Sequence, residues 1–305
     1  KCQPISGRVK KLIVFRIDDF AVEMHHLALS DMIEALLKGS IMQDVIDISW
    51  WQLLFFSSLL LLPIVINHKL KLGLGKEASI SIIRMTVQLF LVGLYLEYLF
   101  TLNSLWVNLL WLFTMIIVGA SSIVEKSKLP RNLLLAPVAV SLAVTCVPIV
   151  LFLCLFIIKP TPVFNAQYLI PIAGMLLGNS LSSNIVALQN LFGAFETQKS
   201  EYEAAIALGA SPSYAAAPFV RNAIQKAMSP IMASMATTGL VTLPGMMTGQ
   251  ILGGASPMIA IKYQLMIMLA IFVMMSCSLA LALHLSLKTS LTKEGRVLAQ
   301  IQPSK

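Results

Sequence analysis

Charged side chains are scarce in this sequence. Of its 305 residues, 12% are Asp, Glu, Lys or Arg and 57% are hydrophobic, whereas soluble domains carry about 25% charged residues. Stretches without any ionised side chain extend over 50–66, 106–124 and 133–158, and roughly 17 to 25 apolar residues are enough to cross a bilayer core. The composition therefore excludes an ordinary soluble enzyme and predicts an all-α integral membrane protein that crosses the bilayer several times.

Side chains that carry catalysis are also rare. The four cysteines lack the pair spacing of a zinc site or a disulfide framework. No His or Asp lies deep in an apolar run, so an intramembrane enzyme would have neither a nucleophile with its base nor metal ligands. The phosphate-binding loop of ATPases is missing too, because Gly73-Leu74-Gly75-Lys76 is too short and has no Ser or Thr after the lysine. We therefore expect no cofactor in this chain, and ATP with magnesium would act only in a partner protein.

The apolar runs predict about seven spans joined by short connectors. The spans cover approximately 50–66, 79–101, 105–124, 133–158, 168–190, 229–254 and 263–286. Lys and Arg gather in alternate connectors and in the tail, while the opposite connectors hold only Lys159 and Lys262. The positive-inside rule then places the N-terminus outside and the tail, 288–305, in the cytoplasm of a cell (inner) membrane. The net charge of +8 is thus interpreted as a topology signal, and no nucleic-acid partner is expected.

The first 41 residues differ from the rest of the chain. Acidic and basic residues alternate there without a run long enough for a signal sequence or a span. We predict a polar N-terminal extension over 1–41 and a transmembrane domain over 42–287, with Met24 and Met42 as alternative natural starts. An external, charged extension conflicts with the positive-inside rule, and the conflict disappears if this segment is not native.

A long polar connector at 192–227 contains Glu203-Ala204-Ala205-Ile206-Ala207-Leu208-Gly209-Ala210-Ser211-Pro212. Its alanines favour a helix with little side-chain bulk, which another surface can approach closely. Gly209 suits the left-handed residue just after a helix end. Ser211 and Pro212 suit the N-cap and first turn of a second helix. The segment predicts a short exposed helix, a tight turn and a helix that returns to the membrane.

Several motifs identify a family by resemblance. Glu-Ala-Ala, three residues and then Gly resembles the cytoplasmic signature of ABC-importer permeases, where it forms the coupling helix that docks on the ATPase subunit. The chain resembles the FetB-type permeases over roughly 42–287. The motifs that carry this resemblance are Pro171–Met175 with Gly178-Asn179, Leu208–Pro212, Leu243–Met247 with Gly249, and Ala260–Gln264.

That resemblance implies a function and an assembly. The chain would be the permease of an ABC transporter that exports iron or another metal, and it would form a homodimer in the membrane lipid with separately encoded ATPase subunits. Coupling to the ATPase would then involve the residues of the signature and of the turn that follows it, namely Glu203, Ala204, Ala205, Gly209, Ser211 and Pro212.

Polar residues within the spans are candidates for a transport pathway. Arg84 and Gln88 share one helix face, although Arg84 also lies near enough to the headgroups to reach them. Asn179 and Asn184 follow the pair Gly174 and Gly178, whose spacing equally suits tight helix packing. All four are candidates for a polar route, with snorkelling of Arg84 to the headgroups and tight helix packing around Asn179 and Asn184 as the alternatives.

The sixth predicted span is rich in glycine and contains a proline. An uninterrupted helix is not expected there, and broken helices occur in membranes only beside protein or a water-filled cavity. We predict a gate or re-entrant element, with a kinked but continuous helix as the alternative. Its residues would be Pro244, Gly245, Met246, Met247 and Gly249.

The substrate does not follow from these residues. Glu97 is the only carboxylate in the predicted spans, whereas hard cations prefer carboxylate oxygens, so the metal ligands stay unknown. The sixteen methionines suit flexible packing better than copper(I) binding. Arg84 and Lys262 would also suit an anionic small molecule such as a nucleotide sugar. An ATP-independent secondary transporter is a further alternative, but such proteins usually carry membrane-embedded acids.

Overall fold

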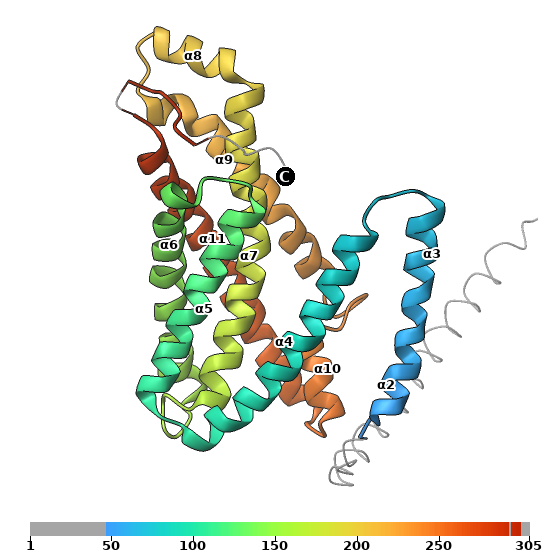
Figure 1. Ribbon diagram of the computed structural model, residues 1–305. Helices are drawn as coiled ribbons and strands as arrows, with labels where there is room; N and C mark the ends of the chain where they lie inside the picture. Colours follow the sequence, from blue (N-terminus) through green and yellow to red (C-terminus); the bar gives the residue numbers. More distant parts are fainter. Residues whose placement is uncertain (1–46, 293, 300–305) are drawn as a thin grey trace, which may run out of the picture. The chain divides into compact units, whose positions relative to one another are not determined.

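Helices form nearly all of the regular structure in the computed structural model, which describes residues 47–292 and 294–299 (Figure 1). The helices are α2 (Trp50–Ser57), α3 (Leu61–Lys69), α4 (Gly75–Leu102), α5 (Leu105–Lys126), α6 (Arg131–Phe152), α7 (Ala166–Thr197), α8 (Lys199–Ala207), α9 (Pro212–Thr237), α10 (Gly245–Leu252) and α11 (Pro257–Ser290). A 3-10 turn, Ser58–Leu60, joins α2 to α3, and a π-helical turn, Leu153–Ile158, extends α6. The prediction of an all-α fold is confirmed.

Six helical stretches in the described part of the chain are long and apolar enough to cross a membrane. They are Trp50–Lys69, Gly75–Leu102, Leu105–Lys126, Arg131–Ile158, Ala166–Thr197 and Pro257–Ser290. These stretches match six of the seven predicted spans. The predicted extension over 1–41 lies outside the described residues.

The predicted span at 229–254 is not one helix. α9 continues from the polar connector to Thr237, the chain then turns over 238–244, and α10 begins at Gly245. Gly239 has φ +89°, and its N–H donates to Thr242 O at 2.9 Å, so the turn closes on itself. The break therefore includes the predicted residue Pro244, whereas the other predicted gate residues, Gly245, Met246, Met247 and Gly249, lie in α10.

Contacts divide the chain into two units. One unit includes Gly245–Ile261, and the other consists of Ile48–Pro244 with Lys262–Lys305. In the larger unit, α7 packs against α5, α6 and α9. The buried side chains of α7 recur every three or four residues, as in Ala173, Leu176, Ser180 and Ser183. α7 is therefore the central helix of this unit.

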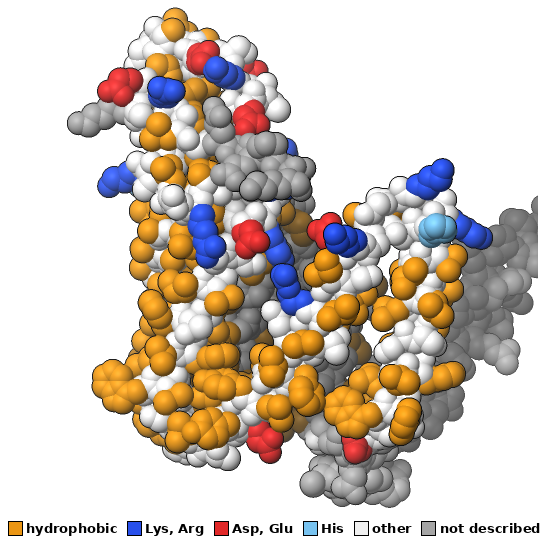
Figure 2. Space-filling model, viewed as in Figure 1, with side chains coloured by type: hydrophobic (Ala, Val, Ile, Leu, Met, Phe, Trp, Pro, Cys, Tyr) orange, Lys and Arg blue, Asp and Glu red, His pale blue; other side chains and the backbone are white. Residues whose placement is uncertain are grey.

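The first helices bury very little. α2 and α3 have no buried residue, and α4 has only Leu99. Their apolar side chains therefore stay exposed. Figure 2 shows hydrophobic side chains along the helices, while Lys and Arg gather near the α3–α4 turn, the α5–α6 turn and α8. Such a surface suits a protein whose spans face lipid or another subunit.

Candidate functional site

The turn between α8 and α9 has the geometry that its sequence predicts. α8 ends at Ala207, and Gly209 has φ +92°. The N–H of Gly209 donates to Ile206 O at 2.9 Å, and the N–H of Ala210 donates to Ala205 O at 3.0 Å. These bonds satisfy carbonyls at the end of the helix, as in helices that terminate with a left-handed glycine. The backbone thus reverses within a few residues.

The second half of the turn starts α9. Ser211 occupies the N-cap position with extended backbone angles, and Pro212 is the first helical residue. Proline suits this position because its fixed φ is helical and its missing N–H would have no partner within the helix. The Ser211 side chain does not cap the helix; its Oγ lies 3.4 Å from Ser213 Oγ. Ser211 therefore contributes backbone shape rather than a capping hydrogen bond.

The segment 203–214, which we call the elbow, exposes two large apolar side chains. Leu208 is 90% exposed and Tyr214 is 76% exposed. Ala204, Ala207 and Gly209 are also exposed, so little bulk surrounds these two side chains. Two large apolar side chains exposed on one short segment make it a candidate for a protein interaction site. Sequence reasoning placed Leu208 in a motif but assigned neither Leu208 nor Tyr214 to coupling, because a leucine beside an alanine-rich helix looks the same whether it is buried or exposed.

Of the other predicted coupling residues, Glu203 and Ser211 are exposed, and Ala205 and Pro212 are half-buried. The Lys199 Nζ lies 3.6 Å from a carboxylate oxygen of Glu203, and both side chains are largely exposed. An exposed pair one helical turn apart adds little stability. Charged residues on α8 suit an aqueous environment, and α8 is not among the helices able to cross a membrane. The elbow therefore presents Leu208 and Tyr214 at the surface of the chain, together with several small residues.

An aromatic cluster anchors the elbow to the helix bundle. Tyr202 is 4% exposed, and its ring meets Phe195 of α7 edge-to-face at a centroid distance of 5.0 Å. Phe219 of α9 lies 5.4 Å from Phe195 and 6.4 Å from Tyr202. Aromatic pairs in these geometries contribute about 0.5–1.5 kcal/mol beyond simple burial. The cluster thus joins α7, α8 and α9 directly behind the exposed surface.

The four predicted pathway residues differ in their surroundings. Arg84 and Gln88 are exposed on α4. On α7, Asn179 is exposed and its Nδ2 donates to the backbone of Met175 at 2.8 Å. Asn184 is buried, and its Nδ2 donates to Ser278 Oγ of α11 at 3.2 Å. Asn184 thus joins two helices.

The two glycines of the predicted close-packing pair differ in their surroundings. A Cβ at Gly174 would lie 3.4 Å from Met115 of α5, whereas a Cβ at Gly178 would meet nothing within 4 Å. Gly174 therefore permits close approach of α5 and α7, and Gly178 leaves that side of α7 open beside Asn179. Within the described ranges, no three His, Cys, Asp or Glu side chains group as a metal site.

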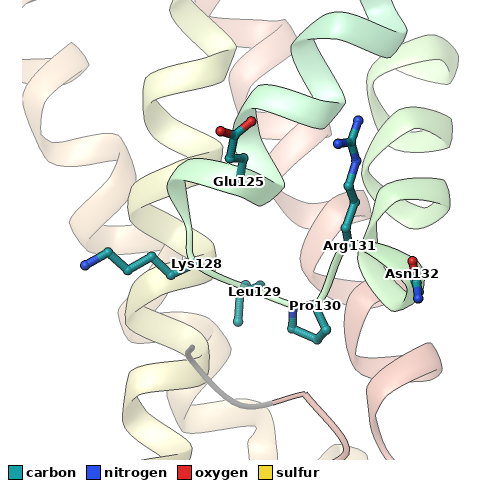
Figure 3. A pocket seen from close by; sticks show the side chains of 6 residues that line it. All are labelled: Glu125, Lys128, Leu129, Pro130, Arg131 and Asn132. Carbon is teal, nitrogen blue, oxygen red and sulfur yellow. The ribbon is translucent and has the colours of Figure 1, made fainter. Parts of the chain in front are cut away.

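A separate pocket of about 390 Å³ lies at the turn between α5 and α6. Its lining residues are Glu125, Lys128, Leu129, Pro130, Arg131 and Asn132. Arg131 donates to Ser121 Oγ at 2.6 Å, and Lys128 has φ +56°. Figure 3 shows the Lys128 side chain pointing away from Arg131. The charged groups therefore do not converge on a single ligand position.

Comparison with known proteins gives matches over most of the chain. The model of a family described as "Uncharacterised protein family (UPF0014)" matches residues 50–291. Protein ALUMINUM SENSITIVE 3 of Arabidopsis thaliana is 35% identical over 209 residues, which is 68% of this chain and 75% of that protein. The probable iron export permease protein FetB of Escherichia coli (strain K12) is 34% identical over 209 residues, 68% of this chain and 79% of FetB.

A rice relative shows similar identity. The UPF0014 membrane protein STAR2 of Oryza sativa subsp. japonica is 35% identical over 208 residues, 68% of this chain and 71% of STAR2. No solved structure matches the chain.

Proposed function

Because this chain belongs to the UPF0014 family of membrane proteins, we propose that it is the permease subunit of an ABC transporter whose ATP is hydrolysed by a separate partner. Membership of this family, which includes the FetB permease, makes the chain a multi-pass membrane transport protein. The identity of the partner, the substrate and the orientation in the membrane are also part of this proposal. ATP and magnesium belong to the partner subunit.

The elbow is the feature that most directly favours an ATPase partner. Leu208 and Tyr214 project from a helix–turn–helix that lies outside the apolar spans, and the aromatic cluster fixes this segment to the bundle. A partner that covers Leu208 would remove it from water, which is worth about 1.5–3 kcal/mol. Glu203, Ala204, Ala205, Gly209, Ser211 and Pro212 shape the same surface, as the resemblance to coupling helices suggests.

The basic connectors support a cytoplasmic elbow. The α3–α4 turn, the α5–α6 turn and α8 lie at the same end of the larger unit (Figure 1), and these segments carry Lys69, Lys71, Lys126, Lys128 and Lys199. Lys and Arg concentrate on the cytoplasmic side of membrane proteins. We therefore orient the elbow and the C-terminal tail to the cytoplasm of the cell membrane, with the N-terminus outside.

The exposed faces of α2–α4 favour a homodimer within the lipid. These helices bury almost no side chain in the single chain, although they are long enough to cross the membrane. A second copy would give Arg84 and Gln88 protein or water as neighbours, whereas an Arg facing lipid costs about 2.5–3.5 kcal/mol on insertion scales. In this arrangement Arg84, Gln88, Asn179 and the break at 238–244 near Pro244 belong to the transport pathway and its gate.

Iron or another metal is the leading substrate class, because one relative is a probable iron export permease. An anionic small molecule is the alternative that Arg84 favours. An ATP-independent secondary transporter would usually need embedded acids, and Glu97 is the sole carboxylate in the predicted spans.

Metal export tests the proposal. Cells that overproduce this chain together with its ATPase are expected to retain less iron, and cells that lack the chain are expected to retain more. Manganese, zinc and copper contents are measured in the same cells for comparison. An ATPase variant that binds but does not hydrolyse ATP should abolish the difference. Export that continues with the inactive ATPase would support a secondary transporter, and unchanged content of every metal would overturn the metal assignment.

A further inference from the structure

The segment after α11 folds back on itself. Leu291 forms an antiparallel bridge with Val297, and the N–H of Leu298 donates to Ser290 O at 2.8 Å. Gly295, with φ +86°, lies in the turn between these residues. The described residues of the tail thus form a closed loop attached to the end of the last span.

This loop is fastened to α8. The hydroxyl of Tyr202 donates to the backbone carbonyl of Gly295 at 3.0 Å in a buried hydrogen bond. A Cβ added to Gly295 would lie 3.2 Å from the Ile206 side chain, so the loop touches α8 at a second point, one turn from Tyr202. Ala299 is also buried. Burial raises the pKa of Tyr202 above its usual value of 10.0, so this phenol keeps its proton near neutral pH.

α8 has few other internal anchors. It is nine residues long, and Tyr202 is its buried residue. A cavity of about 360 Å³ lies beside this contact, lined by Phe192, Lys199 and Tyr202 on the helical side and by Val297 and Ala299 on the loop side. The Tyr202–Gly295 hydrogen bond and the contact at Ile206 therefore join α8 to the loop beside this cavity.

We infer that residues 291–292 and 294–299 form a strap that ties the coupling helix α8 to the last span, and that Tyr202 is the positioning residue that holds it. The inference rests on the proposed function. A displacement of the elbow reaches Tyr202 and then Gly295, which continues into α11. α11 in turn is hydrogen-bonded to α7 through Ser278 and Asn184. Movement applied at the elbow therefore reaches the middle of the bundle by two routes, one through the aromatic cluster and one through the strap.

Tyr202→Phe tests the strap while preserving the aromatic cluster. The ring can still pack on Phe195 and Phe219, but Gly295 O loses its donor. With the full permease and its ATPase in proteoliposomes, we expect unchanged partner binding and near-normal ATP hydrolysis. Transport per ATP should fall by roughly fivefold or more, which is the size of a typical coupling between sites.

Gly295→Ala is the second variant, because it disturbs the strap from the other side through its positive φ and the close Ile206 side chain. It should lower transport per ATP in the same way. Tyr168→Phe, at a half-buried tyrosine near the start of α7, is the matched control and should change neither measurement. All variants are compared at equal amounts in the membrane.

Unchanged transport per ATP in both strap variants would overturn the strap, and so would a loss of partner binding, because the loop would then be part of the docking surface. Neither result would affect the proposed function. If the unsubstituted chain bound no ATPase at all, the proposed function itself would fail.

Discussion

Replacing Leu208 with Glu is expected to abolish co-purification of the ATPase while the permease still accumulates in the membrane. Leu208 is 90% exposed, so the isolated chain loses no packing. In the complex, the substitution removes about 1.5–3 kcal/mol of apolar burial and places an unpaired carboxylate in the interface. A loss of 2 kcal/mol of binding free energy already weakens binding by roughly 30-fold. In a homodimer, the same loss occurs at the elbow of the second subunit.

Leu208→Met is the control at the same position, since it keeps an apolar side chain of similar volume. Pull-down of the partner from detergent-solubilised membranes should be retained with Met and lost with Glu. Equal recovery of the ATPase with both variants would show that the elbow does not dock the partner through this side chain.

Gly209→Val should reduce ATP-driven transport by roughly tenfold or more. Gly209 has φ +92°, a conformation in which a β-branched residue is a clear outlier and an L-residue costs about 1–2 kcal/mol. A Cβ at this position would meet nothing within 4 Å, so the effect is purely one of backbone shape. Relief of the strain would rotate the turn and lose the Ala210 to Ala205 hydrogen bond, thereby redirecting α8.

Gly209→Asn distinguishes an effect of backbone conformation from an effect of replacing glycine as such, because Asn adopts positive φ far more readily than Val does. Transport measured in proteoliposomes should stay near normal with Asn and fall with Val. If Val transported as well as Asn, the turn at Gly209 would not set the position of the coupling helix.

The spans and the elbow turn were predictable because each depends on local sequence. The uncharged run at 133–158 corresponds to the helical stretch Arg131–Ile158, since its length alone satisfies the hydrocarbon core. The turn at Gly209 follows likewise from a glycine that ends one helix and a proline that starts the next. Neither feature needs a distant contact.

Other features depend on contacts that the sequence pattern does not contain. Asn179 and Asn184 look equivalent in sequence, yet only Asn184 faces another helix. The interruption of the helix at Pro244 was predictable from this proline and the glycines around it, but the end of α9 at Thr237 was not, because several glycines compete in this segment. The tail was predicted only as a cytoplasmic segment, since its structure depends on Tyr202, far away in the chain.

The sidedness of the elbow tests the central claim most directly. Ser213→Cys, in a chain whose four native cysteines are replaced, puts a small thiol on the exposed elbow, and Ser256→Cys is the matched thiol on the side that we orient outward. In intact cells, a membrane-impermeant maleimide should label position 256 and leave position 213 unlabelled until the membrane is opened. Labelling of position 213 from outside, or no labelling after the membrane is opened, would contradict a cytoplasmic elbow driven by an ATPase.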